Sequence, residues 1–204
     1  MDKLSKDVLF NIATMLDLDE LLSFCSSDSR INRLVCQGEA IWNFKLMKEF
    51  PDYKSHIKQR GKEAYELLVS LTRLKEGIKY EGSIYELYKK TELDLTNKGL
   101  TALPPEIANL TQLGYLSLSN NQITTLPPEI EKLINLHYLY LNNNKIEILP
   151  PEIGKLKNLR MLLLNGNKIN LLPSEINDLT NLRTLYIDKN VLISGLKIPN
   201  IIFM

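Results

Sequence analysis

The residues that could carry out chemistry in this chain lack the spacing that a catalytic or metal site requires. His56 and His137 stand alone, with no nucleophile or second metal ligand at a motif spacing from either histidine. The pair Gly61-Lys62 lacks the preceding glycine and the following hydroxyl residue of a phosphate-binding loop. We therefore predict that the chain is not an enzyme and carries no cofactor and no metal.

The sequence contains two cysteines, Cys25 and Cys36. Two thiols cannot build a disulfide framework, and no C-x-x-C motif or Cys/His cluster suggests zinc. We expect both to be small apolar core residues in a reducing compartment. The N-terminus lacks the continuous apolar segment of a secretion signal, and no apolar run approaches the roughly 20 residues of a membrane span. The expected location is the cytoplasm.

Carboxylates recur, but at a fixed interval that argues against a catalytic pair. The periodic glutamates, which we expect to face solvent, are Glu106, Glu129, Glu152 and Glu175. The formal net charge is +1, and from residue 91 onward ten Lys and Arg balance ten Asp and Glu. A chain without a basic field is not expected to bind nucleic acid or an anionic membrane.

The strongest pattern is L-x-x-L-x-L-x-x-N, which returns every 23 residues. Its central leucines are Leu93, Leu116, Leu139, Leu162 and Leu185. A fixed period of this length with this pattern is typical of a leucine-rich repeat solenoid. We predict an α/β fold over residues 91–204, a right-handed solenoid with a short parallel β-sheet on its concave face. Buried leucines hold neighbouring coils together because one repeat cannot exclude water from its own leucines.

Two other periodic features are expected to be structural. The asparagines that end the pattern are Asn121, Asn144, Asn167 and Asn190. Their amides both donate and accept, so they can satisfy backbone groups of a turn. The return side carries L-P-x-E-I-x-x-L, where proline suits an extended entry followed by a helical turn. This pattern resembles the 23-residue intracellular repeats of the Ras-suppressor and plant Ras-group type.

Residues between the leucines point outward from each strand and form columns across the repeats. One column is Glu92, Tyr115, Tyr138, Met161 and Thr184; the next is Asp94, Ser117, Tyr140, Leu163 and Tyr186; the third is Thr96, Ser119, Asn142, Asn165 and Asp188. Exposed apolar patches mark interaction sites, and Tyr is enriched among binding hot spots. We predict that a protein partner binds six of these side chains: Tyr115, Tyr138, Tyr140, Met161, Leu163 and Tyr186.

Residues 1–50 have apolar residues at helical spacing and predict a cluster of short helices. The residues that carry a family resemblance are Asp7 and the apolar residues Leu4, Val8, Leu9, Ile12, Leu16, Leu21, Leu22, Ile41 and Trp42. They resemble an F-box, a three-helix motif that docks on the Skp-type adaptor of cullin–RING ubiquitin ligases. The resemblance implies that the adaptor-facing or motif-core positions are Leu4, Val8, Leu9, Ile12 and Leu16.

We predict that residues 51–90 form a helical linker and the cap of the first repeat, since an end repeat would otherwise expose its apolar section.

The leading hypothesis is that the chain is a substrate-recognition subunit of a Skp–cullin–F-box ligase, located in the host cytoplasm if the chain is viral. The alternative is a scaffold or signalling repeat protein, GTPase-associated for example, whose N-terminal helices only cap the solenoid. After Leu192 the residues from Ile193 to Met204 leave the pattern. They either fold over the last repeat as an apolar lid or belong to a truncated chain.

Overall fold

The computed structural model describes residues 9, 13, 15–16, 18–27, 32, 36–37, 39–51, 61–193, 195–198 and 200–204. The chain divides into two compact units, Met1–Ser70 and Leu71–Met204. The boundary lies inside the segment predicted to be a helical linker. Each unit has its own apolar core, and each is described below by itself.

The N-terminal unit contains helices α2 (Leu18–Ser27), α4 (Glu39–Glu49) and the first part of α6 (Gly61–Gly77). Its described core includes Leu21, Ile41, Trp42, Leu46, Ala64, Tyr65 and Leu68. The Trp42 and Tyr65 rings pack with centroids 5.9 Å apart. The Trp42 indole donates a hydrogen bond of 2.9 Å to the carbonyl of Cys36, which satisfies its buried N–H.

A buried lysine connects three parts of this unit. Lys45, only 2 % exposed, forms an ion pair of 3.1 Å with Glu49 and donates to the backbone carbonyl of Leu16. The hydroxyl of Tyr65 donates to the other carboxylate oxygen of Glu49 at 2.7 Å. A buried ammonium group requires such partners, because an unpaired one would lose its hydration without compensation.

The two cysteines correct one expectation from the sequence. Cys25 and Cys36 are buried as predicted, but they are joined by a disulfide rather than present as separate thiols. Their Cα atoms lie 5.9 Å apart, within the range that a disulfide spans. Sequence spacing could not reveal this, because the approach depends on how the chain folds between α2 and α4.

We expect Cys25→Ser to lower the free energy of unfolding of the N-terminal unit by about 3 kcal/mol. The physical reason is that the bond closes a loop over a separation of 11 residues and so restricts the unfolded chain. Urea unfolding followed by the fluorescence of Trp42, with and without reductant, measures the effect. Reductant should destabilise the wild type and leave the variant unchanged; equal stability of the two proteins would contradict the pairing.

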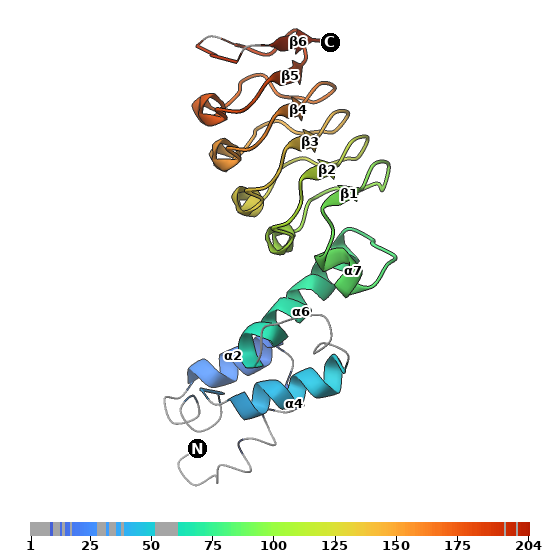
Figure 1. The fold of residues 1–204 in the computed structure, drawn as a ribbon, viewed down its shortest axis with the longest axis vertical. Helices are drawn as coiled ribbons and strands as arrows, with labels where there is room; N and C mark the ends of the chain where they lie inside the picture. The colour runs from blue at the N-terminus through green and yellow to red at the C-terminus, as the bar shows by residue number, and fades with distance from the viewer. Residues whose placement is uncertain are drawn as a thin grey trace. The chain divides into compact units, whose positions relative to one another are not determined.

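The solenoid unit contains a six-stranded parallel sheet in the order β1-β2-β3-β4-β5-β6. The strands are β1 (Glu92–Asp94), β2 (Tyr115–Ser117), β3 (Tyr138–Tyr140), β4 (Met161–Leu163), β5 (Thr184–Ile187) and β6 (Ile201–Phe203). Figure 1 shows them side by side, with short helices lining the opposite side of the coils. Residues 23 positions apart pair from β1 to β5, so the leucine-rich repeat solenoid predicted from the sequence is confirmed.

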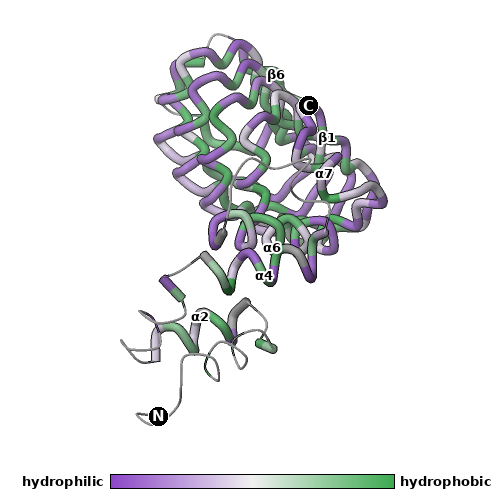
Figure 2. Tube along the Cα trace, turned by 60° about the horizontal axis from the view of Figure 1, so that its bottom comes forward, coloured by the Kyte–Doolittle hydropathy of each residue, from purple (hydrophilic) through white to green (hydrophobic). Residues whose placement is uncertain are grey.

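Short 3-10 helices form the return side of each coil: η2 (Pro105–Asn109), η3 (Pro128–Lys132), η4 (Pro151–Lys155) and η5 (Ser174–Asp178). Each follows a proline with extended backbone, as the L-P-x-E-I pattern predicts. The isoleucines Ile107, Ile130, Ile153 and Ile176 are completely buried. Figure 2 shows hydrophobic residues, in green, recurring along successive coils.

The asparagine ladder is confirmed at three of its four predicted positions. Asn144 accepts a hydrogen bond from the Ile123 N–H at 3.0 Å and donates to the carbonyls of Leu118 and Leu141 at 2.9 and 3.0 Å. Asn121 and Asn167 make the equivalent contacts one repeat earlier and later. These amides therefore replace the backbone ladder that the turn lacks.

The prediction was wrong for Asn190, which is exposed and donates only to the Asn170 side chain at 3.2 Å. The residues before the three bonded asparagines have positive φ: Asn120, Asn143 and Gly166. Asn97 has it at the equivalent place of the first repeat, before Lys98. Before Asn190 the equivalent residue is Lys189, which does not adopt positive φ, although Lys79 elsewhere in the chain does. The turn therefore changes shape, and Val191 rather than Leu192 is buried after it.

A short helix precedes the first strand of the solenoid. Helix α7 (Ile84–Tyr88) begins with a capping box, in which Ser83 and Glu86 exchange hydrogen bonds of 3.1 and 2.8 Å. The bond from the Ser83 N–H, followed by that from its side chain, holds the pKa of Glu86 below its ordinary value. Leu87 of this helix is completely buried, as are Leu71, Leu74 and Ile78 at the end of α6 and just beyond it.

The C-terminal residues, whose structure the sequence left open, fold over the last repeat. Strand β6 pairs in parallel with β5, with Leu185 opposite Ile201 and Ile187 opposite Phe203. The N–H of Leu185 donates to the carbonyl of Asn200 at 3.0 Å. This segment therefore extends the sheet by one strand, although it lacks the repeat pattern.

Alanine substitutions at two glycines should affect stability differently, because neighbouring coils pack closely at only one of them. A Cβ added to Gly154 would lie 2.5 Å from the carbonyl oxygen of Glu175 in the next coil, whereas one added to Gly114 would meet nothing closer than His137 at 3.6 Å. We expect Gly154→Ala to lower the free energy of unfolding by about 1–3 kcal/mol, because the backbone must shift. Gly114→Ala should be tolerated. Urea midpoints of the two variants test this, and equal midpoints would contradict the tight packing of η4 on η5.

Candidate functional site

The strand register brings the six predicted binding residues onto one face of the sheet. Tyr115 pairs with Tyr138, and Tyr138 with Met161, in the first column. The second column continues from Tyr140 to Leu163 and Tyr186. All six side chains reach solvent, whereas the leucines between them in the strands are buried. We call this set, Tyr115, Tyr138, Tyr140, Met161, Leu163 and Tyr186, the tyrosine patch.

Contacts inside the tyrosine patch hold its rings in place. Tyr115 meets Tyr140 edge to face, with centroids 5.2 Å apart and an angle of 80° between the rings. The Tyr140 hydroxyl contacts the sulfur of Met161 at 3.6 Å. Burial, and then the neighbouring tyrosines, raise the pKa of Tyr140 above its ordinary value. Its hydroxyl is therefore protonated at neutral pH, and the ordered rings lose little freedom when a partner binds.

Two positions counted as outward in the sequence columns are covered in the structure. Ser117 and Ser119 are buried and join a chain of hydroxyl contacts. Thr96 lies 2.7 Å from Ser117, and Ser119 donates to the amide oxygen of Asn142 at 2.7 Å. Small side chains cannot reach solvent between larger neighbours, so these serines stabilise the strand ends rather than offering contacts to a partner.

Charged residues lie at one end of the tyrosine patch and along one side of it. Glu92 and Asp94 are exposed on β1, and Arg160 and Arg183 are exposed directly before β4 and β5. Asp94 accepts a hydrogen bond of 2.9 Å from the Thr96 N–H. Hydrogen bonds from Thr96 lower the pKa of Asp94 below its ordinary value, with a smaller contribution from nearby Lys98. Asp94 is therefore ionised at neutral pH.

His137, which the sequence placed one position outside the strand columns, lies beside the patch. It is half-buried, and its ring centroid is 6.5 Å from that of Tyr138. The structure therefore shows His137 in an aromatic contact with Tyr138. No group of three His, Cys, Asp or Glu that could hold a metal ion occurs among the residues described. The helices searched in the described segments include none long and apolar enough to cross a membrane.

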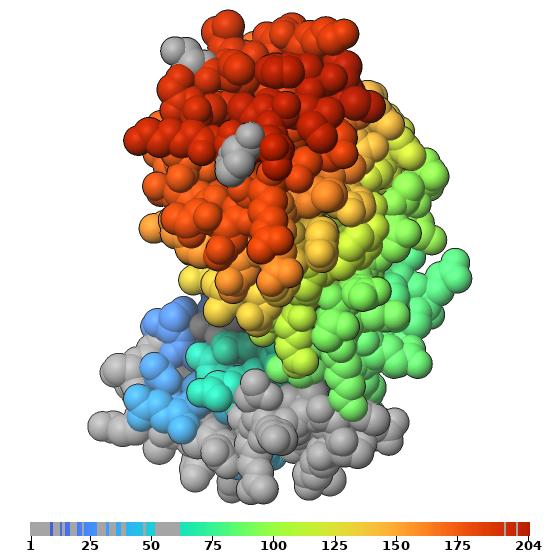
Figure 3. All heavy atoms as spheres, turned by 45° about the horizontal axis from the view of Figure 1, so that its top comes forward, coloured from blue at the N-terminus to red at the C-terminus, as the bar shows by residue number. Residues whose placement is uncertain are grey.

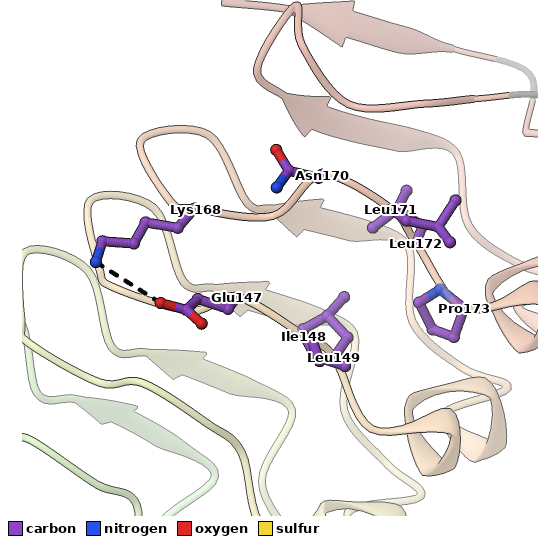
Figure 4. A pocket seen from close by; sticks show the side chains of 8 residues that line it. All are labelled: Glu147, Ile148, Leu149, Lys168, Asn170, Leu171, Leu172 and Pro173. Atoms are coloured by element: carbon purple, nitrogen blue, oxygen red, sulfur yellow. Dashed lines mark ion pairs between the residues drawn. The ribbon is translucent and has the colours of Figure 1, made fainter.

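A second exposed apolar surface was not anticipated from the sequence. A groove of about 620 Å³ is lined by Glu147, Ile148, Leu149, Lys168, Asn170, Leu171, Leu172 and Pro173. Figure 4 shows apolar side chains from two successive coils along it, with the Glu147–Lys168 ion pair of 3.7 Å at one end. Ile148 is 73 % exposed and Leu171 is 64 % exposed. The signal in the sequence is the column Ala102, Thr125, Ile148 and Leu171, which becomes apolar in its last two repeats.

The five F-box-like positions are only partly observable. Leu4, Val8 and Ile12 lie outside the described residues. Leu9 is 1 % exposed, so it belongs to the core of the N-terminal unit. Leu16 is half-buried, and its carbonyl accepts a hydrogen bond from Lys45. The F-box resemblance implies either an adaptor-facing or a motif-core role for each position. The burial of Leu9 agrees with the motif-core role.

Comparison with known proteins identifies the repeats. Residues 91–146 match the family described as "Leucine rich repeat", and residues 128–203 match the one described as "Leucine-rich repeat region". The two matches overlap and together include all six strands. The successive coils are visible as bands from green to red in Figure 3. No curated protein sequence matches the chain.

Solved structures match over part of the chain, and two of the following three are described as leucine-rich repeat structures. A leucine-rich repeat protein from Leptospira interrogans is 36% identical, with a TM-score of 0.40 over 57% of this chain and 33% of its own. The leucine-rich repeat ectodomain of the receptor kinase SOBIR1 from Arabidopsis thaliana is 26% identical, with a TM-score of 0.45 over 54% and 67%. An internalin from Listeria monocytogenes is 24% identical, with a TM-score of 0.42 over 58% and 42%. The match thus spans about a third of the Leptospira protein.

Proposed function

We propose that this leucine-rich repeat chain is a protein–protein interaction adaptor that binds its partner on the tyrosine patch. The observation that carries the proposal is the alignment of six solvent-reaching apolar and aromatic side chains over β2 to β5. Rigid tyrosines are frequent binding hot spots because they contribute large contact areas at a low cost in conformational entropy. Leucine-rich repeat proteins as a class mediate protein–protein interactions.

Affinity purification from native cells, followed by mass spectrometry, tests this proposal. The full chain is compared with a variant that carries Tyr138→Asp and Tyr140→Asp. The expected result is a protein that co-purifies with the wild type and is lost from the variant. Recovery of the same proteins in equal amounts with both chains would contradict binding at the patch.

We further propose that the N-terminal unit docks a Skp-type adaptor, which would make the chain a substrate-recognition subunit of a Skp–cullin–F-box ligase. Two observations support a role beyond capping. The solenoid unit begins at Leu71, and α7 and the end of α6 already supply its cap. Gly77 at the end of α6 also lies close against Pro104 of the first return segment. The N-terminal unit has its own core around Trp42 and Tyr65.

A pull-down against a purified Skp-type adaptor tests this second proposal. We expect the wild type to bind and a variant with Val8→Asp and Ile12→Asp to lose binding. Ile148→Asp, a change on the solenoid surface, serves as the control and should bind normally. Absence of binding by the folded wild type would rule out the adaptor role.

The alternative is a scaffold or signalling protein, GTPase-associated for example, whose N-terminal residues only support the repeats. It predicts that deletion of residues 1–50 costs stability but leaves partner binding intact.

We propose a cytoplasmic location for the chain under both functions. The Cys25–Cys36 bond points in the other direction, because disulfides persist in oxidising compartments. Thiol alkylation in intact cells, followed by mass spectrometry, decides between a reducing and an oxidising compartment: alkylated Cys25 and Cys36 indicate the cytoplasm, and unmodified, bonded cysteines indicate an oxidising compartment.

A further inference from the structure

The exposed charges on the strands of this sheet face, or directly before them, change sign along the solenoid. The acidic end consists of Glu92 and Asp94 on β1, and the basic edge consists of Arg160 and Arg183 before β4 and β5. Within the described part of the chain, neither arginine and neither carboxylate forms an ion pair. Glu92, Arg160 and Arg183 are therefore available to a bound molecule. The Asp94 carboxylate accepts a hydrogen bond from the Thr96 N–H and lies near Lys98, so it adds negative charge at β1 without being a free acceptor.

The surface between the two charged regions is neutral. The outward positions of β2 and β3 hold tyrosines, serines and an asparagine and no charged residue. Asp188, at the far end of β5 from Arg183, has its carboxylate bound to the N–H groups of Gly166 and Asn167 at 2.9 and 3.2 Å. It is thus engaged in holding a turn rather than in balancing the arginines.

The distance between the charged regions limits what can contact both. Three to four strand spacings separate β1 from β4 and β5, which amounts to roughly 14–19 Å. An extended segment of about five residues covers this distance, and so does a helix of about ten to twelve residues. A short protein segment lying across the strands would therefore reach both charged regions.

We propose that the partner presents a segment with an apolar or aromatic centre, a basic residue at the end that faces β1 and an acidic residue at the end that faces β4 and β5. This inference rests on the proposed function of the tyrosine patch. The rings supply affinity, because they exclude water over a broad area. The exposed charges set the direction of the segment, since charges at the rim of an interface affect specificity and association rate more than affinity.

Selection of a phage-displayed library of random twelve-residue peptides on the full chain tests the inference. Peptides enriched on the wild type, relative to the Tyr138→Asp and Tyr140→Asp variant, should carry acidic and basic residues on opposite sides of an apolar centre. For one such peptide, we expect Arg160→Glu with Arg183→Glu to raise the Kd about tenfold. Lys145→Glu with Lys168→Glu reverses two exposed charges outside the patch and should leave the Kd unchanged.

A charge-swapped chain with Glu92→Arg, Asp94→Arg, Arg160→Glu and Arg183→Glu provides the decisive selection. It should enrich peptides whose acidic and basic ends are exchanged. Patch-dependent peptides without charge polarity, or with the same polarity on both chains, would overturn the inference and leave the proposed function standing. Failure to enrich any patch-dependent peptide on the wild type would contradict the proposed function itself.

Discussion

Replacement of Asn144 by alanine should lower the free energy of unfolding of the solenoid by about 3 kcal/mol. The side chain accepts one buried backbone hydrogen bond, from Ile123, and donates two, to Leu118 and Leu141. Each buried group left unpaired costs about 1–3 kcal/mol. Because stacked repeats unfold cooperatively with their neighbours, the loss should affect more than one coil. Urea unfolding followed by circular dichroism measures the change.

Asn190 provides the matched control for this prediction. It occupies the same place in the repeat pattern, but it is exposed and makes only the contact with Asn170. We expect Asn190→Ala to change the free energy of unfolding by less than about 0.5 kcal/mol, as is usual for surface positions. Similar losses for the two alanine variants would show that the amide contacts are not what stabilises the coils.

The double change Tyr138→Asp and Tyr140→Asp should weaken binding of the purified partner at least about 100-fold. It removes two hot-spot candidates and places two charges where a partner must exclude water. Both side chains reach solvent in the free chain, with Tyr138 37 % exposed, so the fold should survive. Isothermal titration calorimetry gives the Kd, and circular dichroism confirms that the coils are intact.

The control for this prediction lies in the second apolar surface. Ile148→Asp with Leu171→Asp also introduces two charges at exposed apolar positions of adjacent coils, but in the groove. These changes should leave the Kd for the same partner within about twofold, because exposed residues outside an interface contribute little. Loss of binding in the groove variant alone would move the binding site from the strands to the groove.

The solenoid was predictable from the sequence because its interactions are local and periodic. Leucines 23 residues apart occupy the same environment in successive coils. The residues that pair from β1 to β5 can therefore be predicted from the repeat length alone. The ladder failed at Asn190 for an equally local reason. The preceding Lys189 does not adopt the positive φ of Asn120, Asn143 and Gly166, so the turn differs although the asparagine is present.

The N-terminal unit and the finer details of the surface were less predictable because they depend on contacts distant in sequence. The bond between Cys25 and Cys36, and the network of Lys45, Glu49 and Tyr65, join segments without a shared period. The burial of Ser117 depends on its neighbours in other coils. The apolar groove was overlooked because its column turns apolar only at Ile148.

A photo-crosslinking amino acid placed at Tyr138 tests most directly whether the strand face binds the partner. A matched chain carries the same group at Ile148, which is more exposed but lies in the groove. Irradiation of each chain with the purified partner, followed by electrophoresis and mass spectrometry, identifies the adducts. We predict a covalent adduct from position 138 and none from position 148. An adduct from position 148 alone would contradict the account.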